Sequence, residues 1–215
     1  MFNVGMRSCS NTWIQRNGLM IALMVMGALM PVILPGDQVD GCDPSRALHV
    51  FVGRYTRETT GDSAKFWETE YENNYHAGIA YRRDVYSFSR RTAAGGEIGL
   101  VARFPERWSF ESWGGMYLRH AGLPLVRRVL VKPSLTLGLS LVDRAIGKER
   151  EREARGDRDA RLLYYFGPEF AFSTAHRPDW EIVLRLHHRS GGMQTLGNMS
   201  EGHNAVTLGM RKHFR

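Results

Sequence analysis

The chain has 215 residues, enough for one sizeable domain, and carries a formal net charge of +7 with a sequence pI near 9.7. A basic surface suits anionic partners, and because the sequence contains neither a helical basic patch nor a nucleic-acid-binding motif, lipid headgroups are favoured over nucleic acid. The 23 glycines favour tight turns and close strand packing over a helical bundle.

The N-terminal segment predicts a signal peptide over residues 1–36. Arg7 and Arg16 precede an apolar run, Gly18–Leu34, which is followed by a polar stretch containing proline and glycine. A basic start, a short hydrophobic core and a polar exit are typical of export signals. The expected cleavage site falls between residues 36 and 41, where no A-x-A motif defines it.

Two other interpretations of this segment stay open. One is a lipoprotein acylated at Cys42; the other is an uncleaved membrane anchor, although the apolar run is short for a span of about 20 residues and Pro31 interrupts it. Cys9 lies inside the expected signal, so the sequence predicts no disulfide framework. After residue 34 no run is apolar enough for a spanning helix, which leaves a soluble periplasmic protein or an outer-membrane barrel.

From residue 47 to the C-terminus the sequence predicts eight strands. Each is a run in which apolar and polar residues alternate with period two, bounded by turn residues. The expected strands cover residues 47–56, 74–88, 97–104, 109–119, 132–142, 162–174, 179–190 and 204–214. The links after the first, fifth and seventh strands are long, as expected for loops on the outer side of a membrane barrel.

The two faces of these strands differ in kind. One face carries large apolar residues, most clearly in residues 132–142, where every second residue from Leu135 to Leu141 is leucine. The other face carries small residues and charges that can pair inside a narrow lumen, namely Arg103, Glu169, Glu181 and Arg185. This pattern predicts an all-β fold, an eight-stranded antiparallel transmembrane β-barrel over residues 47–215. The alternative is a soluble sandwich or lipocalin-like barrel with its apolar face inward.

A densely charged stretch, residues 147–161, separates the fifth and sixth strands. The sequence GKEREREARGDRDAR is typical of a solvated loop or a short helix. A second interpretation is a basic rim that attracts lipid phosphates, for which the candidates are Arg150, Arg152, Arg155 and Arg158.

The seventh strand carries the residues with candidate chemistry. Its apolar face, from Trp180 to Leu186, continues into His188 and Ser190. Two residues on one strand face are about 6.5–7 Å apart, which an imidazole and a hydroxymethyl group can bridge. Histidine can take the proton of serine near neutral pH and so make it a nucleophile. The other two histidines of this region, His187 and His203, are interpreted as structural or exposed.

Four further residues complete the predicted catalytic group. The imidazole needs a partner that holds its tautomer, and Asn204 begins the neighbouring strand on the same face; Glu201, in the preceding loop, is the other candidate. Gly191 and Gly192 follow the serine, and their N–H groups are candidates for holding an oxyanion. Neither a metal nor a cofactor is required by this chemistry.

These residues resemble a known family, the lipid A 3-O-deacylases of the PagL type, grouped with related proteins as acyloxyacyl hydrolases. The resemblance rests on FGPEF at residues 166–170, LRLHHRSGG at 184–192 and GHNAVTLGMRKHF at 202–214. It implies an outer-membrane barrel that removes an ester-linked acyl chain from lipid A, with a His-x-Ser pair on the lipid-facing surface. His188 and Ser190 match that pair, whereas Asn204 stands where the family has glutamate and Gly191 where many members have asparagine.

The resemblance therefore implies a serine hydrolase in the outer membrane of a Gram-negative cell envelope. Its expected substrate is lipid A or lipopolysaccharide, its partners are outer-membrane lipids, no nucleic acid is involved, and a homodimer is left open. The alternatives are a non-catalytic structural barrel with a degenerate site and a soluble periplasmic lipid carrier.

Overall fold

The computed structural model describes residues 45–63, 65–89, 91–126 and 128–214. The expected signal peptide over residues 1–36, its cleavage region and both cysteines lie outside these residues. Within the described ranges, no helix combines the length and the apolar character needed to cross a membrane.

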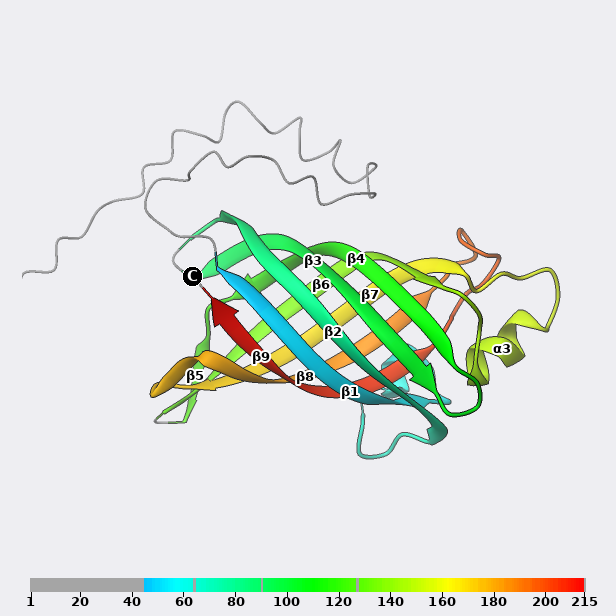
Figure 1. Ribbon diagram of the computed structural model, residues 1–215, viewed down its shortest axis with the longest axis horizontal. Coiled ribbons are helices and arrows are strands. Elements are labelled where there is room, and N and C mark those ends of the chain that lie inside the picture. Colours follow the sequence, from blue (N-terminus) through cyan, green and yellow to red (C-terminus); the bar gives the residue numbers. More distant parts are fainter. Residues whose placement is uncertain (1–44, 64, 90, 127, 215) are drawn as a thin grey trace, which may run out of the picture. The chain divides into compact units, whose positions relative to one another are not determined.

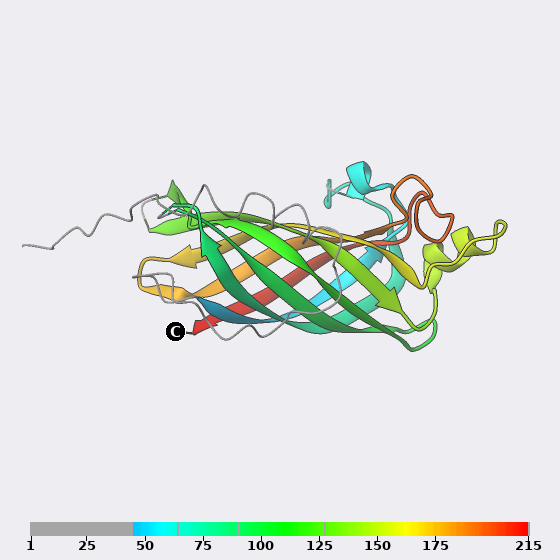
Figure 2. The same ribbon diagram turned by 90° about the horizontal axis from the view of Figure 1, so that it is seen from above.

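Eight antiparallel strands close into a barrel (Figures 1 and 2). They are β1 (Arg46–Thr56), β2 (Tyr71–Ser87), β3 (Thr92–Phe104), β4 (Ser109–His120), β6 (Val129–Val142), β7 (Leu162–Thr174), β8 (Arg177–Ser190) and β9 (Asn204–Phe214). Neighbours along the chain pair with one another, and the β1–β9 and β4–β6 pairings complete the circle. The predicted fold class is confirmed, with strands that extend a few residues beyond several of the expected bounds.

One additional strand and two short helices were not specified by the alternation. β5 (Leu123–Val126) pairs, among the described strands, only with β6; it lies beside Val129–Val131, where β4 does not pair with that strand. Its four residues are all exposed and do not alternate, so period two cannot detect them. The helices α2 (Thr60–Ser63) and α3 (Gly147–Glu153) lie in the loops after β1 and β6.

The outer surface of the barrel wall is apolar. Many large side chains on it are exposed, among them Val52, Ile79, Leu100, Phe110, Met116, Leu137, Phe170, Ile182, Leu208 and Met210. A continuous apolar belt of this kind would be unfavourable in water but is the expected surface of a transmembrane barrel. The alternative of a soluble barrel with its apolar face inward is therefore wrong.

The lumen contains a buried network of ion pairs. Glu169 binds Arg82 at 3.0 Å, Arg185 at 2.5 Å and Arg211 at 2.8 Å. Glu97 contacts Arg185 at 2.6 Å and also pairs with Arg82. Because each buried charge has a partner of opposite sign, the network offsets the cost of removing these groups from water. The prediction that charged side chains fill the lumen is confirmed.

Aromatic rings fill the lumen next to this network. Trp113 and Tyr165 stack with ring centroids 4.4 Å apart, and Phe51 belongs to the same buried cluster. Glycine at position 99 makes room for the indole, since a Cβ there would lie 2.4 Å from Trp113 Cε2. The described barrel is thus a packed structure whose interior is occupied by side chains.

The two ends of the barrel differ in loop length. Residues 57–70, 143–161 and 191–203 form long loops at one end, together with the short link 105–108, and the opposite end has links 88–91, 121–128 and 175–176. Figure 2 shows α2, α3 and the β8–β9 loop gathered at the end opposite the C-terminus. Long loops face the cell exterior in outer-membrane barrels, so we assign this end as extracellular.

The helix α3 closes part of the extracellular end. Its Glu149 is fully buried and pairs with Arg103 at 2.7 Å and with Arg189. The short helix expected for the charged stretch is therefore present. Of the arginines considered for a basic rim, Arg150 pairs with Glu106 at 2.5 Å and Arg152 donates to the Gly202 carbonyl at 2.7 Å.

Candidate active site

The candidate site lies at the extracellular end of β8, on the outer surface of the barrel. His188 and Ser190 both project from this face, as the alternation predicted, and the residues between and beside them project into the lumen. The site therefore opens toward the membrane and the loops and not toward the barrel interior.

Two inward side chains anchor this end of β8. His187 Nε2 lies 2.8 Å from Glu111 Oε1, which supports its interpretation as structural. Arg189 donates to Ser140 Oγ and to the Ala160 carbonyl, both at 2.8 Å, and pairs with Glu149. These contacts lie directly behind the candidate residues, so the strand that carries them is held from the lumen side.

The imidazole of His188 is held by Asn204. The two residues are directly opposite in the β8–β9 ladder, and His188 Nδ1 lies 2.5 Å from Asn204 Oδ1. Asn204 Nδ2 donates to the Glu58 carbonyl at 2.9 Å, which assigns the orientation of the amide. Because Oδ1 can only accept, Nδ1 carries the proton and Nε2 of a neutral ring is left as the base.

Thr60 is a contact of the imidazole that sequence reasoning missed. Its Oγ1 lies 3.0 Å from His188 Nδ1 and 3.4 Å from Nε2. The residue comes from α2, which is tied to the barrel by a 2.7 Å hydrogen bond between Ser63 Oγ and Thr56 Oγ1. A threonine in a long loop carries no periodic signal, so no pattern in the sequence could have indicated this contact.

The hydroxyl of Ser190 is turned toward the β8–β9 loop. Its Oγ donates to the Ser200 carbonyl at 2.9 Å and accepts from the Gly192 N–H at 3.0 Å. Among the described residues, its side chain has no direct hydrogen bond with His188. The pair therefore shares one surface, and a rotation of the serine side chain is needed to bring the two groups together.

Different constraints require glycine at the two positions after Ser190. A Cβ on Gly191 would lie 1.8 Å from the Met199 carbonyl oxygen, so the loop closes too tightly there for any side chain. Gly192 has a φ of +58°, in the left-handed region, and its N–H is directed at the Ser190 hydroxyl. Of the two predicted oxyanion donors, Gly192 is the one with a contact to the candidate nucleophile.

Glu201 lies apart from the imidazole contact. Its carboxylate is 3.5 Å from the Arg152 guanidinium, and among the described residues it makes no hydrogen bond to His188. Asn204 and Glu201 were the two candidates for holding the tautomer of His188. Of the two, Asn204 contacts the imidazole.

A groove joins the candidate residues to the apolar wall. It has a volume of about 510 Å³ and is lined by Thr60, Leu137, Gly138, Tyr164, Tyr165, Phe166, His188, Ser190 and Gly192. The phenyl ring of Phe166 meets the imidazole edge to face, with centroids 6.1 Å apart. The combination of an apolar trough with a histidine and a serine at one end suits an acyl chain that carries a polar ester.

Comparison with known proteins supports the fold. Neither a family model nor a curated protein matches the chain. The outer-membrane enzyme PagL has a similar solved structure, with a TM-score of 0.51, 9% identity, and coverage of 77% of this chain and 98% of that one. Neisserial surface protein A (NspA) is similar with a TM-score of 0.50, 9% identity, and coverage of 80% and 100%. Together with the apolar belt, these likenesses identify the chain as an eight-stranded outer-membrane β-barrel protein.

Proposed function

We propose that the protein is an outer-membrane serine esterase that removes an ester-linked acyl chain from lipid A. The observation that carries this proposal is the groove in which His188, held by Asn204, and Ser190 meet the lipid-facing wall at the extracellular end. A glycolipid of the outer leaflet has its ester groups at this depth and its acyl chains beside the wall. The resemblance of the sequence around residues 184–192 and 202–214 to lipid A deacylases supports the same activity.

In the first step Ser190 attacks the ester carbonyl. Its side chain leaves the Ser200 carbonyl, at the cost of a hydrogen bond worth about 1 kcal/mol, and turns toward His188. His188 Nε2 takes the hydroxyl proton, while the Nδ1–H group continues to donate its hydrogen bond to Asn204 Oδ1. The C–O bond that forms yields a tetrahedral oxyanion, for which the Gly192 N–H is the nearest donor once the hydroxyl has moved.

The second step transfers the acyl chain to the serine, and the third releases it. Collapse of the tetrahedral intermediate breaks the ester C–O bond, and the sugar oxygen takes the proton from His188 Nε2. A water molecule, deprotonated by the same nitrogen, then attacks the acyl-serine; the bond to Ser190 Oγ breaks and the imidazolium returns the proton to Oγ, so the products are a free fatty acid and a lipid A with one fewer acyl chain. Asn204 bears no charge and stabilises the imidazolium less than a carboxylate would, which favours a slow enzyme.

The test is the mass spectrum of lipid A from cells that express the protein. The unaltered chain should remove one acyl chain, and Ser190→Ala should lower that deacylation by at least about a thousandfold while the barrel still forms. Ser200→Ala is the matched control, because it removes an exposed hydroxyl in the same loop and keeps the carbonyl that Ser190 contacts.

A non-catalytic barrel is the second candidate, and one observation favours it. The Ser190 hydroxyl is bonded to the loop backbone and not to the imidazole. This candidate predicts identical lipid A spectra with and without the protein. Full deacylation by the Ser190→Ala variant would instead reject the serine as nucleophile and retain the enzyme.

A further inference from the structure

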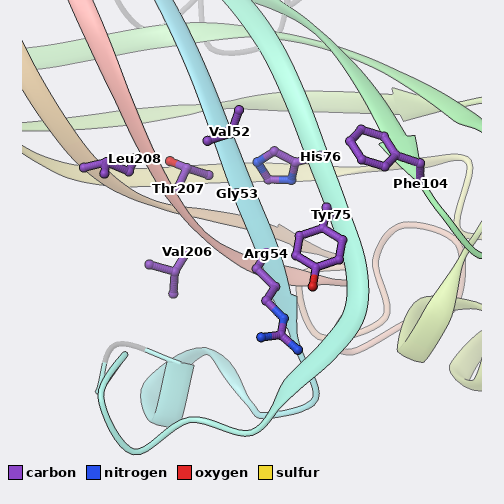
Figure 3. A pocket seen from close by; sticks show the side chains of 9 residues that line it. All are labelled: Val52, Gly53, Arg54, Tyr75, His76, Phe104, Val206, Thr207 and Leu208. Atoms are coloured by element: carbon purple, nitrogen blue, oxygen red, sulfur yellow. The ribbon is translucent and has the colours of Figure 1, made fainter.

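A second groove lies on the outer wall, over β1, β2, β9 and the end of β3. It has a volume of about 400 Å³ and is lined by Val52, Gly53, Arg54, Tyr75, His76, Phe104, Val206, Thr207 and Leu208 (Figure 3). Val52 and Leu208 on its sides are more than half exposed. The floor is backbone at Gly53, where a Cβ would lie 2.5 Å from His76 Nε2 on the lumen side. A side chain at position 53 would thus clash on the lumen side, and the groove on the outer face is bounded by the outward neighbours Val52 and Arg54.

Aromatic residues mark the level of this groove in the membrane. Tyr75 stacks on Phe104 with centroids 6.5 Å apart, and Phe104 meets Trp108 at 5.3 Å. Tyrosine and tryptophan gather at the boundary between hydrocarbon and headgroups in membrane barrels. The extracellular end of the groove therefore lies at the headgroups of the outer leaflet, and its apolar part lies among acyl chains.

Arg54 places a positive charge at the headgroup end of the groove. Arg54 is exposed on the outer face, its Nε donates to the Glu72 carbonyl at 2.8 Å, and its guanidinium carbon lies 5.3 Å and 5.4 Å from the ring centroids of Tyr71 and Tyr75. Among the described residues, no carboxylate forms an ion pair with it. The aromatic rings and the backbone hold the guanidinium in place, and among the described residues its terminal N–H groups make no hydrogen bond.

We infer that this groove binds a phosphate-bearing acylated lipid of the outer leaflet. Arg54 takes the phosphate, since a guanidinium presents two parallel donors that match two phosphate oxygens. The trough between Val52, Val206 and Leu208 takes an acyl chain. Binding at this site requires no hydrolysis, so the inference goes beyond the proposed activity and does not depend on it.

The strand register relates this groove to the candidate active site. Arg54 pairs with Val206, which pairs with Leu186 of β8, and the next outward row joins Thr56, Asn204 and His188. Two strand spacings sideways and two residues along the strand separate Arg54 from His188 by about 12 Å. A single phosphorylated glycolipid is large enough to span that distance.

The test measures lipid retained by the full chain after purification in detergent, by native mass spectrometry. The protein carries Ser190→Ala, so that the probe is not consumed, and the probes are bisphosphorylated lipid A and the same lipid after phosphatase treatment. Arg54→Gln is compared with Arg46→Gln, which removes an exposed arginine from the same face of β1 at the opposite end.

The inference predicts that Arg54→Gln weakens binding of phosphorylated lipid A about tenfold and that Arg46→Gln leaves it unchanged. The unaltered groove should prefer the phosphorylated probe by a similar factor. Equal binding in the two variants, or equal binding of the two probes, would overturn the inference. Displacement of phosphorylated lipid A by inorganic phosphate at the same concentration as the lipid would also overturn it, because the site would then bind a free phosphate ion.

A second pair of variants tests the acyl part of the groove. Val206→Phe fills the trough and should reduce retention of both probes, whereas Ile79→Phe adds the same ring to the outer face outside the groove and should not. Unchanged retention in Val206→Phe would contradict a bound acyl chain. Since none of these measurements needs turnover, failure of the esterase proposal would leave this result intact, and the reverse also holds.

Discussion

Asn204 is the residue that decides how His188 can react. Its side-chain oxygen accepts from Nδ1 and its side-chain nitrogen donates to the Glu58 carbonyl, so the amide cannot turn over without losing both hydrogen bonds. The imidazole is therefore held with Nε2 as its basic nitrogen, which is the tautomer that a serine esterase needs. An asparagine gives this orientation without the charge that would stabilise the imidazolium.

We expect Asn204→Ala to lower lipid A deacylation roughly 100-fold, because the imidazole loses the partner that holds its tautomer. Asn204→Asp places a carboxylate at the same position and should raise the rate up to about tenfold, since a charged acceptor stabilises the imidazolium. Release of fatty acid by the purified barrel measures both effects. Asn73→Ala, on the exposed face of β2, is the control. A faster Asn204→Ala variant would reject the positioning role.

Glu201 provides a separate test at the same scale. Its carboxylate pairs with Arg152 at 3.5 Å, and the tautomer contact belongs to Asn204. Glu201→Gln should therefore change kcat/KM for deacylation by less than about threefold, as expected for a partly exposed ion pair. A loss comparable with that of Asn204→Ala would show that the loop carboxylate, and not the asparagine, supports the imidazole during turnover.

Among the elements, α3 and the long loops make the extracellular end a defined structure. Glu149 reaches from α3 into the barrel to pair with Arg103 and Arg189. Arg189 is the residue before Ser190, so the same ion pair links the loop after β6 to the strand that carries the candidate nucleophile. His203, in the loop before β9, stacks on Tyr55 with centroids 3.9 Å apart and contacts Glu72 at 3.1 Å.

The docking of α3 should depend on pH. Burial by itself raises the pKa of Glu149, but Arg103 and Arg189 outweigh it and hold that pKa below its usual range. A carboxyl with a lowered folded-state pKa adds stability above its unfolded value of about 4.3 and loses it as pH falls through the folded-state value. Hydrogen exchange in residues 147–153 should thus be slow at neutral pH and accelerate only in strong acid.

Glu149→Gln should remove that pH dependence. The variant leaves two buried arginines without their common partner, which costs about 3–5 kcal/mol in comparable cases, so α3 should exchange rapidly already at neutral pH. Glu151→Gln, on the exposed side of α3, is the control. Slow exchange in Glu149→Gln at neutral pH would contradict the role given to the ion pairs.

At the scale of the whole molecule, the barrel buries charged side chains in its lumen and presents apolar side chains on its membrane-facing wall. Glu169 is the centre of the lumen network, with three arginines from three strands around it. Because these strands are β2, β8 and β9, the network ties together parts of the wall that do not all neighbour one another. Removing one member of this network would therefore leave buried charges unpaired in several parts of the wall.

We expect Glu169→Leu to lower the free energy of unfolding by about 3–5 kcal/mol, because the three arginines lose a shared buried partner. Glu70→Gln removes a largely exposed carboxylate and should change it by no more than about 0.5 kcal/mol. Urea unfolding of the barrel in lipid vesicles, followed by tryptophan fluorescence, compares the two. Equal unfolding curves would contradict a stabilising network.

Strand positions and strand faces could be read from the sequence because period-two alternation reports both at once. Residues 132–142 and 179–190 each present their apolar set to the lipid as predicted, and Arg185 and Glu169 lie in the lumen. β5 was missed because four exposed residues have no alternation. The placement of Asn204 beside His188 followed from the parity of the last strand, which puts Asn204 on the outward face at the loop end, and the family resemblance singled out the same positions.

The sequence by itself thus determined an eight-stranded barrel, the face on which His188 and Ser190 lie, and the presence of charged residues in the lumen, because each follows from local periodicity. Only the tertiary structure decided that Thr60 touches the imidazole, that Glu149 enters the barrel, that the Ser190 hydroxyl points to Ser200, and that a groove forms over Gly53. The Ser190 contact depends on how the β8–β9 loop folds. The others join loops or strands distant along the chain, where closure of the barrel, and not any repeating pattern, brings the residues together.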